Sequence, residues 1–304
     1  MAGKNPKNSE ILIEAAESRS LWQEAWRRFK KNRLAMICLG FMLLLTIIAL
    51  STIAIDLITD NGFYNNNVIS QDLDNKLRPP TLKHPFGQDE FGRDIFLRVL
   101  WGTRYSLFMG MLSVAGATIV GGTLGAIAGF YGGKSDHIVM RVMDVLMAMP
   151  AILLAIVIVA ALGHGLGNVL IAISIFFVPN FARVVRAAVM TLREQEFVEA
   201  ADAVGASDFR IISEQILPNA IAPIIVQITL GVATAITFIA ALSFLGLGIQ
   251  PPSPEWGAML ASARAHMRDA WHITVIPGLA IMLTILSLNI VGDGLRDALD
   301  PKLK

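Results

Sequence analysis

The strongest constraint on this chain is a series of long apolar runs with few charged residues. The first covers residues 34–55 without a single charge, and about 20 apolar residues suffice for one helical crossing of a bilayer. The chain is 54% hydrophobic and 16% charged, with a mean hydropathy of +0.59. This balance excludes an ordinary soluble domain and predicts an all-α, polytopic membrane bundle.

The runs predict six transmembrane helices. They cover residues 34–55, 105 to about 130, roughly 139–162, 169 to about 187, a run that starts near 220, and 273–291. Pro150 predicts a kink in the third span. The fifth uncharged run lasts to Pro254, longer than one crossing needs, so we expect it to bend at the outer face. In the second span Gly121, Gly125 and Gly129 are spaced for close contacts between helices.

The distribution of basic residues predicts the orientation. A cluster of Arg and Lys at residues 27–33 directly precedes the first span, and such a cluster stays in the cytoplasm. Six spans then return the C-terminus to the cytoplasm. Most of the 25 Lys and Arg residues fall on that side, although Arg98 and Arg104 do not. Residues 20–33 are expected to form an amphipathic interfacial helix, preceded by a polar, poorly ordered tail.

Residues 56–104 are expected to lie outside the membrane. Asp94 can cap a helix whose apolar side contains Ile95, with Arg98 and Arg104 on the opposite side. We predict a short interfacial helix here, which serves either as a lipid anchor or as a docking surface. A second external helix is expected at about residues 256–268.

One polar stretch, residues 193–219, interrupts the apolar runs, and we call it the EAA segment. A first helix is expected to carry Phe197, Ala200, Ala201 and Val204 on one face and to end at Gly205 in a left-handed cap. A second helix is expected to begin at Ser207, to carry Phe209, Ile212 and Ile216 on one side, and to stop at Pro218. Such a pair either docks a partner or lies on lipid headgroups.

Catalytic and metal-binding patterns are absent from the sequence. The string AGFYGGKS at residues 128–135 fits a relaxed phosphate-loop pattern, but it follows a predicted membrane helix instead of a buried strand. The five histidines have no ligand spacing, so no metal or cofactor is expected. Cys38 is the only cysteine, which excludes an intrachain disulfide. A net charge of +1 gives no reason to expect nucleic acid as a partner.

The amino-acid sequence of the EAA segment resembles a motif of a known protein family. Glu199, Ala200, Ala201, Gly205, Leu217 and Pro218 match the "EAA" loop of permease subunits of ATP-binding-cassette (ABC) importers. In that family the loop docks into a cleft on a cytoplasmic ATPase, and small residues let the partner's surface approach closely. Gln215 departs from the pattern, because many members carry Ile there.

Four further stretches resemble the C-type permease of dipeptide, oligopeptide and nickel importers. They are GQDEFGRD (residues 87–94), ALSFLGLG (241–248), QPPSPEWG (250–257) and GDGLRDALDP (292–301). The resemblance implies the type I ABC importer permease fold in a bacterial inner membrane. It also implies four kinds of partner: a second, B-type permease, two cytoplasmic ATPases, an external solute-binding protein and the lipid bilayer. ATP hydrolysis is then expected on the ATPases, not on this chain.

The resemblance favours di- and oligopeptides as the imported solute. Nickel chelates, glutathione or another small solute remain as alternatives, because the binding protein selects the solute first. A stand-alone secondary carrier is disfavoured because the spans show no ion-coupling carboxylates at mid-membrane and no inverted repeat. A non-transporting scaffold would give no reason for a Gly-rich, Pro-kinked bundle.

Three regions are predicted along the chain: residues 1–33, residues 34–104 with the first span, and residues 105–304 as the core permease domain. The candidate pathway residues are Met143, Met147, Thr229, Thr234 and Thr237. A membrane-facing hydroxyl gains no partner from lipid, so these threonines face either a cavity or a neighbouring helix. The candidate residues on the binding-protein side are Asp89, Arg93, Asp94 and Trp256.

Overall fold

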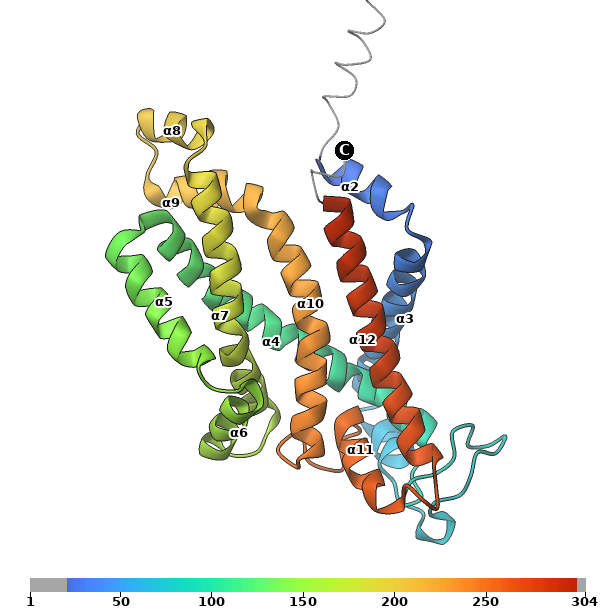
Figure 1. Cartoon of the computed structure of the whole chain (residues 1–304). Helices are drawn as coiled ribbons and strands as arrows, with labels where there is room; N and C mark the ends of the chain where they lie inside the picture. Colours follow the sequence, from blue (N-terminus) through green and yellow to red (C-terminus); the bar gives the residue numbers. More distant parts are fainter. Residues whose placement is uncertain (1–20, 300–304) are drawn as a thin grey trace, which may run out of the picture.

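The computed structural model describes residues 21–299, and this part of the chain is a bundle of long helices (Figure 1). Within the described residues the only extended pairing is an isolated bridge between Gln88 and Asp94. The predicted all-α class is therefore confirmed. The tail expected at residues 1–20 lies outside the described residues.

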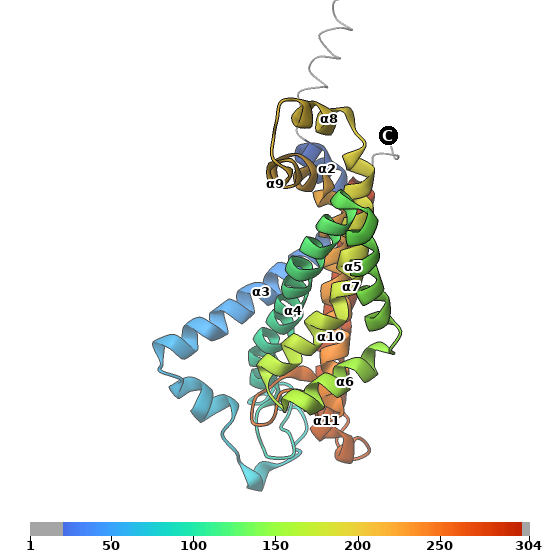
Figure 2. The ribbon, with the colours of Figure 1, turned by 90° about the vertical axis from the view of Figure 1, so that its left-hand side faces the viewer.

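The long helices are α3 (Arg33–Ile58), α4 (Ile95–Tyr131), α5 (Gly133–Met147), α6 (Ala151–Leu162), α7 (Leu166–Arg193), α10 (Leu217–Phe244) and α12 (His272–Leu299). The shorter helices are α2 (Leu21–Phe29), α8 (Glu196–Ala203), α9 (Asp208–Arg210) and α11 (Trp256–Ala263). Single turns of other helix types are η1 (Tyr64–Val68), η2 (Leu73–Asn75), η3 (Ile211–Ile216) and η4 (Arg264–His266). In Figures 1 and 2, α2, α8 and the end of α12 lie at one end of the bundle and α11 lies at the other.

Five helices are long and apolar enough to cross a membrane, and α5 with α6 supplies a sixth crossing if the bent pair is one span. The predicted kink at Pro150 is a full break, since α5 and α6 meet at 89° (Figure 2). Proline has no N–H to donate and disfavours the helical conformation of the residue before it. The α5 helix therefore ends before Pro150, and Pro150, with an extended ψ of 131°, takes the N-cap position from which α6 starts anew.

The interfacial helix predicted after Asp94 is not a separate element. Asp94 does cap it, accepting a hydrogen bond from the Leu97 N–H at 3.0 Å. However, the helix continues without a break to Tyr131, through the region boundary expected at residue 104. Arg98 lies in this helix but is buried beside the carboxylate of Asp89, 3.4 Å away. Since its charge is balanced inside the protein, the helix has no need to stop at the membrane surface.

The most extensive helix contact joins α4 to α7, and glycines make it possible. A Cβ added at Gly121 would lie 2.4 Å from the carbonyl oxygen of Val178. One at Gly125 would lie 2.3 Å from the Ala182 carbonyl oxygen, and one at Gly129 would lie 2.8 Å from that of Arg186. The glycines repeat every four residues, and so do the carbonyls they meet. The predicted small-residue pairs therefore hold two backbones together.

The C-terminal end of α3 is tied to α4 by a buried carboxylate. Asp56 accepts hydrogen bonds from the guanidinium of Arg104 at 2.5 Å and from the indole N–H of Trp101 at 3.1 Å. Asp56 was expected to begin the external segment, yet α3 continues to Ile58. The charge is tolerated inside the helix because Arg104 neutralises it.

The close approach of α4 and α7 gives a direct stability prediction. Gly125→Ala should destabilise the protein by about 1–3 kcal/mol, because the new methyl meets a backbone carbonyl that cannot rotate away. The measurement is the midpoint of unfolding in mixed micelles of rising SDS fraction. Gly122→Ala is the matched control, since a Cβ there first meets Val185 at 3.8 Å. Equal effects of the two substitutions would contradict the packing described.

Candidate functional site

The EAA segment forms a helical projection at one end of the bundle, between the end of α7 and the start of α10 (Figures 1 and 2). It consists of α8, a short connection, and α9 with η3. These residues bring together the candidates Glu199, Ala200, Ala201 and Gly205 in one small structure.

The predicted left-handed cap at Gly205 is confirmed. Gly205 has a φ of +83°, and its N–H donates to the carbonyl of Asp202 at 2.8 Å. The next N–H, that of Ala206, donates to the carbonyl of Ala201 at 3.1 Å. These two bonds form a Schellman motif, which satisfies the last carbonyls of α8. No atom lies within 4 Å of a Cβ added at Gly205, so the backbone conformation alone requires glycine.

The second helix of the segment differs from its prediction. Ser207 takes the N-cap position, but its side chain makes no capping hydrogen bond. Residues Ile211–Ile216 form a π-helical turn, in which the Leu217 N–H donates to the Ile212 carbonyl. This wider turn interrupts the usual hydrogen-bond ladder directly before Pro218, whose missing N–H therefore costs little. Pro218 consequently does not end the helix, which runs on into α10.

The wider turn also separates side chains that were expected on one face. Ile216 is completely buried, whereas Phe209 is 80% exposed. Ile211, rather than Phe209, points inward with Ile216. A strict 3.6-residue period cannot place these residues, because a π-helical turn shifts the phase of everything that follows it.

A small apolar core fixes the projection to the bundle. Val198 of α8 and the buried isoleucines of η3 pack against Val185 and Val189 of α7 and Ala126 of α4. In addition, the Arg193 guanidinium donates to the Phe130 carbonyl at 2.6 Å, which joins the ends of α7 and α4. The projection is thus held by the same two helices that pack through glycines.

The outward face of the projection is open. A hollow of about 440 Å³ lies between α8 and η3, lined by Phe197, Ala200, Ala201, Val204, Gly205, Ala206, Arg210, Ile211, Glu214 and Gln215. Val204 is 84% exposed, and Glu199 on the neighbouring surface is exposed as well. Arg210 and Glu214 form an ion pair of 2.9 Å at the side of the hollow. Exposed apolar groups beside charged ones are typical of a surface that binds another protein.

The remaining two candidates of the EAA motif lie at the base of the projection. Leu217 is half-buried against the small core and Pro218 is exposed. They begin α10, so they connect the projection to a membrane helix instead of facing outward with Gly205.

The candidate pathway residues divide into buried and exposed positions. Met143 is buried in the main core, while Met147, Thr234 and Thr237 are exposed. The hydroxyls of Thr229, Thr234 and Thr237 each donate to the carbonyl four residues earlier, at 3.0, 3.0 and 3.1 Å. Each hydroxyl therefore already has a hydrogen-bond acceptor within α10. It does not require a cavity or a neighbouring helix to supply one.

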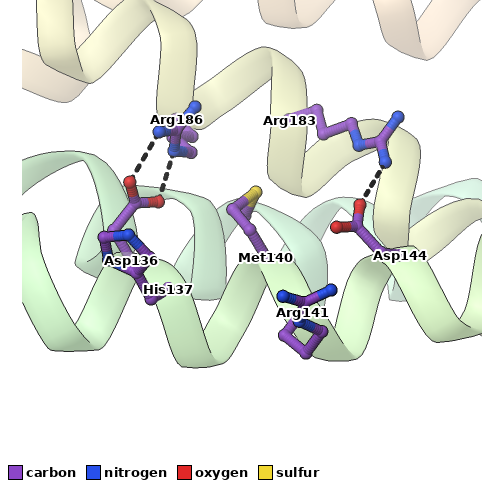
Figure 3. Close-up of a pocket in the computed structure, with 7 residues that line it drawn as sticks. All are labelled: Asp136, His137, Met140, Arg141, Asp144, Arg183 and Arg186. Carbon is purple, nitrogen blue, oxygen red and sulfur yellow. Dashed lines mark hydrogen bonds and ion pairs between the residues drawn. The ribbon is translucent and has the colours of Figure 1, made fainter.

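A second hollow, which the sequence did not suggest, lies between α5 and α7 (Figure 3). Its volume is about 540 Å³. Arg186 holds Asp136 through two hydrogen bonds of 2.5 and 2.6 Å, and Arg183 holds Asp144 through one of 2.6 Å. Arg141 and Asp144 are three residues apart and could pair within α5, but Asp144 binds Arg183 of the neighbouring helix instead. The signal in the sequence is the set of charges inside two predicted spans, at 141 and 144 in the third and at 183 and 186 in the fourth.

The candidates at the opposite end are mostly buried. Asp89 binds the Arg93 guanidinium at 2.7 Å and also accepts the Arg93 backbone N–H at 2.9 Å. Asp94, besides capping α4, accepts a contact of 2.6 Å from His84. The Trp256 indole N–H donates to the Val99 carbonyl at 3.0 Å. These side chains hold the segment before α4 and α11 on the bundle, and Asp89, Arg93 and Trp256 are buried within the chain.

Beside Trp256, the Glu255 carboxylate is fully buried at the start of α11. It accepts hydrogen bonds from the N–H groups of Gly257 and Ala258, both at 2.8 Å, and from the Ser106 hydroxyl at 3.2 Å. Burial raises the pKa of this carboxyl above its usual value, and the hydrogen bonds oppose that shift. Glu255 therefore joins α11 to α4 in the same external structure.

The phosphate-loop-like string does not have the geometry of a nucleotide site. Residues 128–131 are the last turn of α4, Gly132 and Gly133 turn the chain at φ values of +63° and +51°, and Lys134 lies in the first turn of α5. A phosphate loop follows a strand, whereas this one joins two helices.

The comparisons with known proteins agree on one kind of protein. Residues 121–304 match the family described as "binding-protein-dependent transport system inner membrane component". Residues 20–80 match the N-terminal TM domain of oligopeptide transport permease C.

Among curated relatives, the dipeptide transport system permease protein DppC of Alkalihalophilus pseudofirmus is 50% identical over 285 residues, covering 94% of this chain and 91% of the relative. The glutathione transport system permease protein GsiD of Escherichia coli O6:K15:H31 is 46% identical over 297 residues, covering 98% and 96%. A structure of the MetNI methionine ABC transporter in an inward-facing conformation has a TM-score of 0.55 at 18% identity, and covers 68% of this chain and 98% of that one. The last likeness concerns the fold alone.

Proposed function

Because this chain belongs to the family of binding-protein-dependent transport system inner membrane components, and within it to the C-type permeases of dipeptide and oligopeptide ABC importers, we propose how it works as part of such an importer. It forms one wall of the pathway, and a B-type permease forms the other. Two ATPases bind the cytoplasmic side, and a solute-binding protein delivers the solute from outside. The chain itself supplies no nucleotide site.

The observation that carries this proposal is the attachment of the EAA segment. The projection presents an open face with Phe197, Val204 and Glu199, while its inner face is fixed to α4 and α7. It is also continuous with α10 through η3. A partner that binds the open face therefore pulls on three membrane helices at once. Closure of the two ATPases around ATP would draw the projections of the two permeases together and switch the pathway between its openings.

The orientation follows from the same arrangement. The ATPases are cytoplasmic, so the end that bears the EAA segment faces the cytoplasm. The α2 helix and the end of α12 lie at that end too (Figure 1), as the basic cluster before α3 predicts. We therefore place the chain in the bacterial inner membrane with both termini in the cytoplasm.

Short peptides are the solute class that the relatives favour. One close relative is named for dipeptides and another for glutathione, which is itself a tripeptide. A solute with a free carboxylate and a free ammonium group is common to both. Nickel chelates and other small solutes remain alternatives of the same importer class, and uptake of dipeptides by the assembled importer distinguishes them.

Docking of the ATPases is tested at Gly205. Gly205→Leu should reduce co-purification of the ATPase subunits and peptide uptake by about tenfold or more, because leucine both strains the left-handed cap and blocks close approach. Gly246→Leu is the matched control. Gly246 has a similar φ of +80°, also has no atom near an added Cβ, and lies at the opposite end of α10.

The control separates backbone strain from loss of docking. Gly246→Leu carries the same strain but should keep the ATPase subunits bound. If Gly205→Leu assembled and transported fully, the docking role of the EAA segment would be wrong. If both variants lost the ATPase equally, the effect would be one of folding.

Exposure of α10 to the pathway is a second test. With Cys38 replaced by alanine, cysteines at Thr234 and Thr237 should react with a water-soluble thiol reagent in the assembled importer. Ala235→Cys is the control, since Ala235 is completely buried. Absence of labelling at 234 and 237 in every transport state would remove these residues from the pathway.

A further inference from the structure

The hollow between α5 and α7 contains an ion pair, Asp144 with Arg183, that lies far from the end of the bundle that bears the EAA segment. Asp144 lies eleven residues after Gly133, about 16 Å along α5 at 1.5 Å per residue. Arg183 lies at a similar distance from the end of α7 at Arg193. Their side chains are 53% and 46% exposed. A half-exposed ion pair at this depth is costly against lipid, so this face borders water.

The surface of α5 supports the same conclusion. Ile138, Val142 and Val145 form an exposed apolar stripe along one side of the helix. Asp136, Met140 and Asp144 lie on a different side, toward α7, with Met140 between the two ion pairs, and Arg141 also lines the hollow without reaching toward α7 (Figure 3). The helix thus offers one face suited to lipid or a partner helix and a separate polar face.

Arg141 is the unusual group in this hollow. Three arginines and two aspartates line it, and Arg186 and Arg183 each hold one aspartate. In the described part of the chain, no hydrogen bond or ion pair engages the Arg141 guanidinium. A third cation without a carboxylate beside it is ready to bind an anionic group.

We propose that the α5–α7 hollow is a transit site for the charged ends of a short peptide, with Arg141 and Arg183 receiving the terminal carboxylate and Asp144 the terminal ammonium group. This inference rests on the proposed function, and it assigns the recognition of the solute to residues of this chain. The volume of about 540 Å³ falls in the range of about 300–1,000 Å³ typical of small-molecule sites. The Asp144–Arg183 pair has one contact and is exposed, so it can open to admit a ligand, whereas the doubly bonded Asp136–Arg186 pair is the firmer support.

The test measures protection of a single cysteine in the hollow. Met140→Cys in a Cys38→Ala background is assembled with the second permease, the ATPases and the binding protein in proteoliposomes. The rate of modification by a water-soluble methanethiosulfonate is then measured without nucleotide. Millimolar dialanine should slow the reaction at least about threefold, and dialanine amide and N-acetyl-dialanine should slow it much less. Each of these two analogues lacks one of the charges.

Arg141→Gln is the decisive variant, because this guanidinium has no structural partner to lose. The concentration of dialanine needed for protection should rise about tenfold, the effect of removing one charge-assisted hydrogen bond. The labelling rate without peptide should not change. Arg268→Gln, which removes an exposed arginine near α11 outside the hollow, is the matched control and should leave protection intact.

Three results would overturn the inference. They are labelling that dialanine does not slow, equal protection by dialanine and its amide, and equal protection in Arg141→Gln and the parent. In each case uptake of dialanine by the parent importer would show that the proposed function stands without this site. If the parent importer accumulated no dipeptide, the proposed function itself would fail.

Discussion

The direct contact between the backbones of α4 and α7 is the interaction on which the rest of the structure depends. Three glycines on α4 each face a carbonyl oxygen of α7 at a separation that no side chain could tolerate. In a bilayer the hydrophobic effect does not drive helices together, so close packing must supply the attraction. The glycine stripe supplies it along the half of both helices nearest the EAA segment, and fixes the position of the end of α7 from which that segment begins.

The contact between α4 and α7 also determines the position of the helical projection formed by the EAA segment. Its small apolar core packs against the ends of α4 and α7. Arg193 also links these two helix ends by donating a hydrogen bond to the Phe130 carbonyl. On the other side, the π-helical turn lets the chain pass Pro218 without a break and become α10. A force on the open face is thus transmitted to the bundle through packed side chains and through a continuous helix. Between the end of α7 and the start of α10, Gly205 is the one residue with a left-handed backbone conformation.

Much of this could be predicted from the sequence, because apolar length and glycine chemistry are local properties. The spans, the cap at Gly205 and the small-residue pairs of α4 follow from them. Features that depend on a distant neighbour could not be predicted. Arg98 was assigned to a surface because nothing in the sequence shows Asp89 beside it, and nothing in the sequence pairs Asp144 with Arg183, which is 39 residues away. The π-helical turn could not be predicted, because an extra residue in one helical turn does not change the amino-acid composition in a recognisable way.

The central idea is that the helical projection and the α4–α7 pair move as one block. Pulsed electron paramagnetic resonance can test it directly, with spin labels on cysteines at Asp202 of α8 and Ile119 of α4, both exposed, and with Cys38 removed. In the assembled importer the distance distribution should be narrow and should not change when ATP is added to trap the closed ATPases. A distribution that broadens or shifts on ATP binding would reveal a hinge between the projection and the bundle, and would contradict transmission by a rigid block.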